Sequence, residues 1–212
     1  MRQELRHPAF RRVSISRKHR FCYFRVPKAA NSTIIQTLQA NMRAEESESV
    51  ARFPKHALHG VPDPKEMAGL FVFTVVRNPV TRLLSAYLEK APQEKYRKKY
   101  GFYHRDNRKL FSFEDFLQRL QDGLLYSDIH WAPQTSILPY DLKKYSHIGK
   151  FELLNDELDF ITSEIFSKPC KIHNVDSHKT NSKDFLSKIT NRELRIVRDM
   201  FEKDFIELNY DI

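Results

Sequence analysis

The sequence predicts an α/β fold in which helices flank a central parallel sheet. A strand-like apolar segment, a turn and an amphipathic helical pattern follow one another twice, over residues 20–42 and over residues 69–88. Repeats of this kind give parallel strands joined by right-handed crossovers. The 212 residues also fit one domain of ordinary size, large enough to bury a core without disulfides or metals.

The first repeat begins with "RFCYFRV", residues 20–26, a short aromatic and β-branched segment that is typical of a strand buried on both faces. A helix is expected after it, because its apolar residues recur at spacings that place them on one helical face. These residues are Ile34, Ile35, Leu38 and Met42.

The second repeat contains the most strand-like segment of the chain, "GLFVFTVV", residues 69–76. Arg77, Asn78 and Pro79 end this strand, and a proline just inside a helix start favours helix formation. The apolar stripe predicted for the following helix consists of Val80, Leu83, Leu84, Tyr87 and Leu88.

Residues 89–111 break this pattern, because they are basic and aromatic without a clear hydrophobic period. We expect this segment to be an insertion that lies over one edge of the site. Ser112 then begins an amphipathic helix in which Asp115 has the position of a capping residue.

The remainder of the chain is expected to add a short strand and two helices. The strand is predicted within residues 146–154, and Asn155 and Asp156 begin a helix directly after it. Thr190 and Glu193 have the spacing of a capping box at the start of the last helix. No linker divides the chain, so residues 1–212 are predicted to form a single domain.

The charge of the chain indicates an anionic ligand or partner. The 36 lysines and arginines exceed the 27 acidic residues, and the net charge of +9 attracts anions. Basic residues concentrate in an N-terminal extension, residues 1–19, and in the 89–111 insertion. Each concentration could be a solvated surface without a ligand, and the N-terminal one could instead contact a membrane surface.

The cysteine content and the apolar segments indicate in which cellular compartment the protein is expected. Cys22 and Cys170 are the two cysteines, and they form neither a disulfide framework nor a metal-ligand pattern. No run of about 18 apolar residues occurs, and the basic N-terminus is not followed by the apolar core of a signal peptide. We therefore expect a cytoplasmic protein.

A candidate anion-binding turn follows the first predicted strand. Lys28 is expected at the carboxyl edge of the sheet, where open α/β folds bind their ligands. The small residues after it let backbone N–H groups approach an anion, and the helix dipole favours negative charge there. A Walker A motif is absent, so Ser32 or Thr33 could simply cap the helix beside a solvated Lys28. The candidate ligands are Lys28, Ala29, Ala30, Asn31, Ser32 and Thr33.

A second candidate lies at the end of the second predicted strand. Arg77 has the corresponding position, and the helix after it carries Arg82 and Ser85 three residues apart, on the face away from the apolar stripe. An arginine and a serine can hold one phosphate through bidentate and single hydrogen bonds. Two anion-binding strand ends suggest one ligand with two separated anionic groups.

These two segments resemble a known pair of motifs. "VPKAANST", residues 26–33, and "VVRNPVTRLLSAY", residues 75–87, are similar to the 5'-phosphosulfate and 3'-phosphate motifs of sulfotransferases that use 3'-phosphoadenosine 5'-phosphosulfate (PAPS). The likeness is to the carbohydrate sulfotransferases that include the Golgi chondroitin and dermatan enzymes. "DIHW" (128–131), "SHIGKFELLNDELDFI" (146–161) and "MFEKDFIELNY" (200–210) extend the resemblance. It implies one sulfotransferase domain with a P-loop-NTPase-like three-layer fold.

Two features differ from the Golgi enzymes of this group. Those enzymes carry an N-terminal membrane anchor, and several have paired cysteines shortly after the His-Trp motif. Residues 132–145 contain no cysteine here. We therefore interpret the chain as a bacterial-type soluble member, and the acceptor specificity of the Golgi enzymes does not transfer to it.

The resemblance implies in-line transfer of a sulfuryl group from PAPS to a hydroxyl of a carbohydrate or glycoconjugate. Lys28 would stabilise the leaving oxygen, and the N–H groups of residues 30–33 would hold the 5'-phosphate. Arg77 and Ser85 would hold the 3'-phosphate, with Arg82 assisting or bracing the turn. The scheme needs no metal, and no nucleic acid partner is expected.

The acceptor hydroxyl must lose a proton, and histidine is the side chain best suited to accept it near neutral pH. The resemblance places a histidine before the second strand, which favours His56 as the base, although a surface loop position is equally compatible. His130 is the alternative base, unless it forms a buried structural pair with Trp131. His59, His130 and Trp131 are weaker candidates for contacts with the acceptor.

Two other functions stay open from the residues alone. A nucleotide-dependent kinase of related fold is disfavoured by the missing Walker glycines and by the lack of an evident magnesium-binding carboxylate. A non-catalytic protein could bind polyanions through the basic and aromatic residues 89–109. The same residues suggest an anionic acceptor, whose identity the sequence does not fix.

Overall fold

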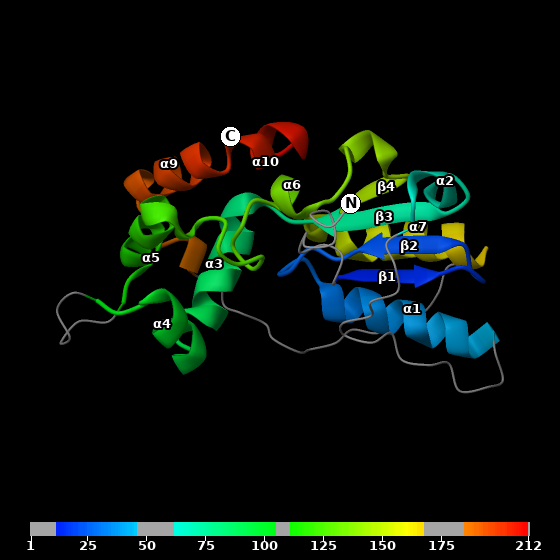
Figure 1. Ribbon diagram of the computed structural model, residues 1–212, viewed down its shortest axis with the longest axis horizontal. Coiled ribbons are helices and arrows are strands. Elements are labelled where there is room, and N and C mark those ends of the chain that lie inside the picture. The colour runs from blue at the N-terminus through cyan, green and yellow to red at the C-terminus, as the bar shows by residue number, and fades with distance from the viewer. Residues whose placement is uncertain (1–11, 46–61, 105–110, 168–184, 212) are drawn as a thin grey trace. The chain divides into compact units, whose positions relative to one another are not determined.

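The computed structural model describes residues 12–45, 62–104, 111–167 and 185–211 (Figure 1). These residues form two compact units. The first unit consists of the described residues within Met1–Val76 and Ile137–Ser177, and the second consists of those within Arg77–Ser136 and His178–Ile212. Each unit has an apolar core of its own.

The first unit is built on a four-stranded sheet with the order β1-β2-β3-β4. The strands are β1 (Val13–Ser16), β2 (Phe21–Phe24), β3 (Phe71–Val76) and β4 (His147–Lys150). The strands β2, β3 and β4 are parallel, as the sequence predicts, whereas β1 pairs antiparallel with β2. The strand β1 is not predicted by the sequence, because its four residues fall within the basic N-terminal segment, residues 1–19.

Two helices cover one face of this sheet. They are α1 (Asn31–Glu45) and α7 (Leu154–Phe166), and their apolar side chains share a core with alternate residues of β2 and β3 (Figure 1). On the opposite face, the Phe24 ring contacts the rings of Tyr140 and Tyr145 edge-on. The same unit contains α2 (Pro64–Met67) and the 3-10 turns η4 (Leu142–Lys144) and η5 (Phe151–Leu153).

The second unit is helical. Its elements are α3 (Pro79–Lys90), α4 (Glu94–Tyr100), α5 (Phe113–Arg119), η3 (Leu120–Leu124), α9 (Asn191–Met200) and α10 (Glu202–Glu207). The short helix α6 (Gln134–Ile137) lies where the chain passes back to the first unit. The core of the second unit is rich in aromatic rings, and Trp131 lies among the rings of Tyr100, Phe102 and Phe116.

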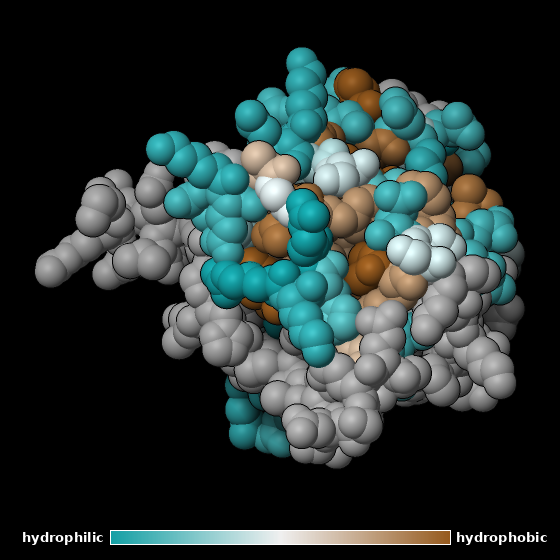
Figure 2. Space-filling view, turned by 90° about the vertical axis from the view of Figure 1, so that its right-hand side faces the viewer, coloured by the Kyte–Doolittle hydropathy of each residue, from teal (hydrophilic) through white to brown (hydrophobic). Residues whose placement is uncertain are grey.

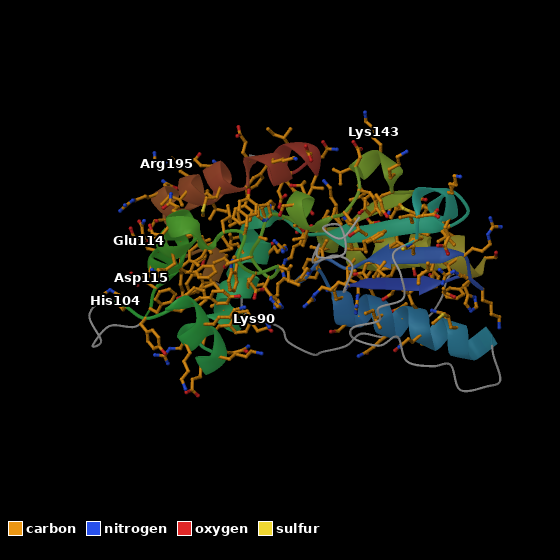
Figure 3. All side chains as sticks on the ribbon, in the orientation of Figure 1. Lys90, His104, Glu114, Asp115, Lys143 and Arg195 are labelled. Atoms are coloured by element: carbon orange, nitrogen blue, oxygen red, sulfur yellow. The ribbon has the colours of Figure 1, made fainter. Side chains whose placement is uncertain are left out.

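Several local predictions for the second unit are confirmed. Ser112 caps α5 in a full capping box with Asp115, which Figure 3 labels, and Thr190 does the same for α9 with Glu193. Within residues 89–111 lies the helix α4, which the sequence did not predict because its 7 residues are too few to show a hydrophobic period. Gly101 ends α4 in the left-handed conformation, where a residue without a Cβ is favoured.

The surface of the first unit mixes polar and apolar side chains. Figure 2 shows teal hydrophilic residues beside brown hydrophobic ones on the side where the sheet lies. Leu153 and Phe160 are the large apolar side chains that this unit exposes among its described residues. Within the described ranges of the chain, no helix has the length and apolar character to cross a membrane.

Candidate functional site

The turn between β2 and α1 has an unusual backbone. Lys28 and Ala30 have φ angles of 71° and 56°, in the left-handed region. For residues other than glycine this conformation costs about 1–2 kcal/mol each, and it is found preferentially at functional sites. The turn therefore has the backbone geometry that glycines give to a phosphate-binding loop, although its sequence contains no glycine.

Contacts within the first unit hold this turn in place. Ala29 is fully buried, while Lys28 is partly exposed. The Tyr23 hydroxyl donates to the Asn31 side-chain oxygen at 2.7 Å, and burial raises the pKa of Tyr23, so that the hydroxyl stays protonated as a donor. The Ile34 N–H donates to the Ala30 carbonyl at 3.0 Å.

The helix after the turn presents an end suited to an anion. The first N–H groups of an α-helix have no partner within the helix, and the helix dipole adds partial positive charge there. In α1 these groups belong to residues from Asn31 onward, including Ser32 and Thr33. With Lys28 three residues before the helix, this turn combines the features of a phosphate site.

The turn between β3 and α3 is stabilised by side chains instead. The Asn78 side-chain oxygen accepts hydrogen bonds from the N–H groups of Val80 and Thr81, at 3.0 and 3.3 Å. Pro79 occupies the first turn of α3, where a missing N–H carries no cost. No residue between Arg77 and Pro79 has a positive φ angle.

Arg77 is bonded into the second unit through both its main chain and its side chain. Its side-chain Nε donates to the Thr81 hydroxyl at 3.1 Å. Its backbone N–H donates to Gln134 Oε1 at 2.9 Å, and its carbonyl accepts from Gln134 Nε2 at 2.7 Å. Arg77 is 8% exposed and Gln134 is 0% exposed. Sequence reasoning missed Gln134, although it lies three residues after the "DIHW" motif.

Arg82 is directed into the protein interior. Its Nη1 donates to the Ala132 carbonyl at 2.8 Å and its Nη2 to the Ile129 carbonyl at 2.9 Å. Burial lowers the pKa of the guanidinium to about 10, so it stays charged at neutral pH. Of the two roles predicted for Arg82, these contacts support the bracing role, and the braced element is the segment around the "DIHW" motif.

The side of α3 that carries Arg82 and Ser85 is buried. Arg82 and Ser85 are 1% and 3% exposed and lie on a helix that is buried around most of its circumference. A helical period alone does not show whether other segments cover this side of the helix, so the burial of these two residues could not be predicted from the sequence. Ser85 can thus meet a ligand only where the ligand itself enters a buried position.

The "DIHW" motif forms a hydrogen-bonded turn. Asp128 Oδ1 lies 2.6 Å from His130 Nδ1 and accepts the His130 backbone N–H at 3.0 Å. The Tyr100 hydroxyl donates to Asp128 Oδ2 at 2.9 Å. Burial raises the pKa of Asp128, but the hydrogen bonds and charge of His130 and the bond from Tyr100 outweigh it and lower the pKa to about 2. The imidazole is therefore fixed by an ionised carboxylate.

The remaining predicted site residues have different outcomes. Trp131 is fully buried and its indole N–H donates to the Leu124 carbonyl at 2.8 Å, which places it in the core and not at a surface that an acceptor can reach. His56 and His59 lie outside the described residues, so their predicted roles stay predictions. Among the residues that the structure describes, no three His, Cys, Asp or Glu side chains are grouped to hold a metal ion.

Comparisons with known proteins agree with the motifs. The profile of the sulfotransferase family matches residues 11–211. Carbohydrate sulfotransferase 10 of Xenopus laevis is 27% identical over an alignment of length 244, and this alignment covers 94% of this chain and 67% of that protein. Carbohydrate sulfotransferase 9 of Homo sapiens is 25% identical over an alignment of length 236, and this alignment covers 94% of this chain and 53% of that protein. No solved structure matches the chain.

Proposed function

The chain belongs to the sulfotransferase family, whose profile matches residues 11–211, and we propose that it transfers the sulfuryl group of PAPS to a hydroxyl of a carbohydrate or glycoconjugate. The observation that carries this proposal is the β2–α1 turn, in which two left-handed residues, a lysine and a helix N-terminus occur together. The names of the relatives supply the acceptor class. We also propose that this turn and its sheet correspond to the phosphate loop and sheet of a P-loop-like fold.

In the proposed reaction, the acceptor oxygen attacks sulfur as the bond from sulfur to the bridging oxygen of PAPS breaks. The leaving group is 3'-phosphoadenosine 5'-phosphate (PAP), and negative charge develops on its 5'-phosphate. Lys28 would neutralise that charge, while the N–H groups of residues 30–33 hold the phosphate. Charge that is matched only in the transition state lowers the barrier without tightening ground-state binding.

The 3'-phosphate of the donor is assigned to the second turn. Arg77 would bind it through its guanidinium and Ser85 through its hydroxyl, by resemblance to the family motif. Arg82 is assigned a supporting role, because both of its terminal nitrogens already donate to carbonyl oxygens. No metal is needed for either phosphate.

The proton of the acceptor goes to a histidine. We retain His56 as the proposed base, and His130 is the alternative because the Asp128 carboxylate orients its ring. Replacement of His56 by alanine is expected to lower turnover at least about a hundredfold while PAP binding is preserved, since a general base contributes about that much. A comparable loss in His130→Ala, with His56→Ala active, would assign the role to the "DIHW" turn.

The acceptor is proposed to be anionic. The helix α4 exposes Lys95, Arg97, Lys98 and Lys99. The Lys95 and Lys99 ammonium groups lie over tyrosine rings at 5.1 and 4.6 Å from the centroids. Cations held in this way keep their charge at the surface while their stems are packed, which suits carboxylate or sulfate groups of a glycan.

A thermal-shift comparison of PAP, PAPS, ADP and ATP tests the proposal. A ligand at a hundredfold excess over its dissociation constant stabilises the folded state by about 2.7 kcal/mol, so a specific nucleotide is easily detected. We expect PAP and PAPS to raise the melting temperature well above the effect of ADP and ATP. Stabilisation by ATP with magnesium but not by PAP would favour a kinase instead, and binding without nucleotide preference that weakens steeply with salt would indicate a polyanion-binding protein.

A further inference from the structure

The Gln134 side chain makes two hydrogen bonds to the main chain of a single residue, Arg77. Its side-chain oxygen accepts the Arg77 N–H at 2.9 Å and its side-chain nitrogen donates to the Arg77 carbonyl at 2.7 Å. The two bonds fix the Arg77 main chain on both sides of its Cα. A side-chain amide offers both a donor and an acceptor in this arrangement, whereas an apolar side chain offers neither and an ionised carboxylate offers no donor.

Gln134 is itself held by a buried carboxylate from the C-terminal helix α10. Asp204, which is 0% exposed, accepts the Gln134 backbone N–H at 2.6 Å through one oxygen. Its other oxygen accepts the Thr135 backbone N–H at 2.9 Å and the Thr135 hydroxyl at 2.8 Å. The positions of Asp204, Gln134 and Arg77 are thereby linked in one chain of hydrogen bonds within the second unit.

We propose that Gln134 is a positioning residue that orients Arg77 for the 3'-phosphate of the nucleotide, with Asp204 holding Gln134 in place. Burying an amide costs free energy that an apolar side chain of the same shape would avoid. A residue needed only to fill this volume would therefore be apolar, and the glutamine is better explained by its two hydrogen bonds to Arg77. The guanidinium reaches a phosphate through a flexible side chain, and a small rotation of the main chain at its base displaces it by much more. Fixing that main chain preserves the bidentate geometry. This inference rests on the proposed function, because it assigns Arg77 to PAP.

The test compares two nucleotides that differ only in the 3'-phosphate. PAP and 5'-AMP are titrated against the parent chain, Gln134→Met and Gln134→Glu. The first variant removes both bonds to Arg77, and the second keeps an acceptor for its N–H but removes the donor to its carbonyl. We expect the dissociation constant for PAP to rise about tenfold or more in Gln134→Met, and less in Gln134→Glu. Affinity for 5'-AMP should change less than about twofold, because nothing at its 5'-phosphate is altered.

The matched control is Gln93→Met. Gln93 also donates from its side-chain nitrogen to a backbone carbonyl of the same unit, that of Glu89 at 2.7 Å, but it does not contact Arg77. We expect this variant to bind both nucleotides like the parent chain. In an Arg77→Ala background, Gln134→Met should have no further effect on PAP, because a positioning residue acts only through the residue that it positions.

The outcomes separate this inference from the proposed function. Selective loss of PAP affinity that disappears in the Arg77→Ala background supports the positioning role. Equal loss of PAP and 5'-AMP affinity, or a loss that persists without Arg77, would show that Gln134 only stabilises the fold and would overturn the inference alone. A parent chain that binds PAP no better than 5'-AMP would overturn the assignment of Arg77 and the inference together. If Gln134→Met does not fold, the affinities of Gln134→Glu for PAP and 5'-AMP, measured with and without Arg77, decide between these outcomes.

Discussion

The two strand-to-helix turns of this protein, after β2 and after β3, are held in their conformations by different means. The turn after β2 relies on backbone conformation, with Lys28 and Ala30 in the left-handed region. The turn after β3 relies on side chains, with Asn78 capping α3 and Gln134 bonded to Arg77. A partly exposed side chain such as that of Lys28 can be changed at little cost in stability, whereas a buried side chain such as that of Arg82 cannot. Substitution of Lys28 in the first turn should therefore affect mainly catalysis, and substitutions of the buried residues after the second turn should affect stability as well.

The largest expected effect is in the first turn. Lys28→Ala should lower turnover by about 100-fold to 1000-fold, the loss typical of removing one group that stabilises developing negative charge. Its free energy of unfolding should change by less than about 0.5 kcal/mol, as for most partly exposed side chains. Steady-state sulfuryl transfer from PAPS and urea unfolding measure the two quantities.

The control for Lys28→Ala is Lys28→Arg, which keeps the charge and should retain a larger part of the activity. Full activity of Lys28→Ala would remove the turn from the catalytic site. A strong loss of stability would instead contradict the proposed contrast between the two turns.

The next largest effect is in the second unit. Arg82→Ala should lower the free energy of unfolding by about 2–4 kcal/mol, because it removes the donors to the buried Ala132 carbonyl and the partly buried Ile129 carbonyl. Urea unfolding measures this change, and PAP titration of the remaining folded protein should give a nearly normal affinity. A variant of normal stability that no longer binds PAP would show that Arg82 is a phosphate ligand and that its bracing role is minor.

The acid stability of the second unit depends on Asp128. The pKa of this carboxyl is about 2 in the folded protein, below the value of about 3.9 in an unfolded chain, so ionised Asp128 stabilises the fold above pH 4. This contribution, about 2–3 kcal/mol, is lost as the pH falls from about 4 to about 2. Asp128→Asn should be less stable at pH 6 by a similar amount and should lose less stability over that pH range.

Denaturant unfolding between pH 2 and pH 6 measures the Asp128 contribution. Asp122→Asn provides a matched control, because Asp122 is exposed and accepts a single bond from Gln118. Parallel pH curves for the parent chain and Asp128→Asn would show that the carboxylate of the "DIHW" turn does not contribute in this way.

The sequence predicted the parts of the fold that depend on local patterns. The strands β2 and β3, the helices after them and both capping boxes follow from hydrophobic period and cap chemistry, which act over a few residues. The strand β1 was missed because strand pairing is a long-range property that its basic sequence does not display. The buried environment of Arg82 and Ser85 was missed for a similar reason, since other segments create it. Gln134 and Asp204 lie 57 and 127 residues from Arg77, and only the folded chain brings them together.

The smallest expected effect tests whether the first turn is truly strained. Ala30→Gly should raise the free energy of unfolding by about 0.5 kcal/mol, because relief of the left-handed conformation slightly exceeds the entropy that glycine adds to the unfolded chain. Ala29→Gly is the matched control: Ala29 is buried and has no positive φ angle, so the same substitution should cost about 1 kcal/mol. Urea unfolding of both variants, each with PAP and without it, measures the difference. Equal destabilisation by the two glycines would mean that the turn stores no strain, and the resemblance of this loop to a glycine-rich phosphate loop would then rest on Lys28 and the helix N-terminus alone.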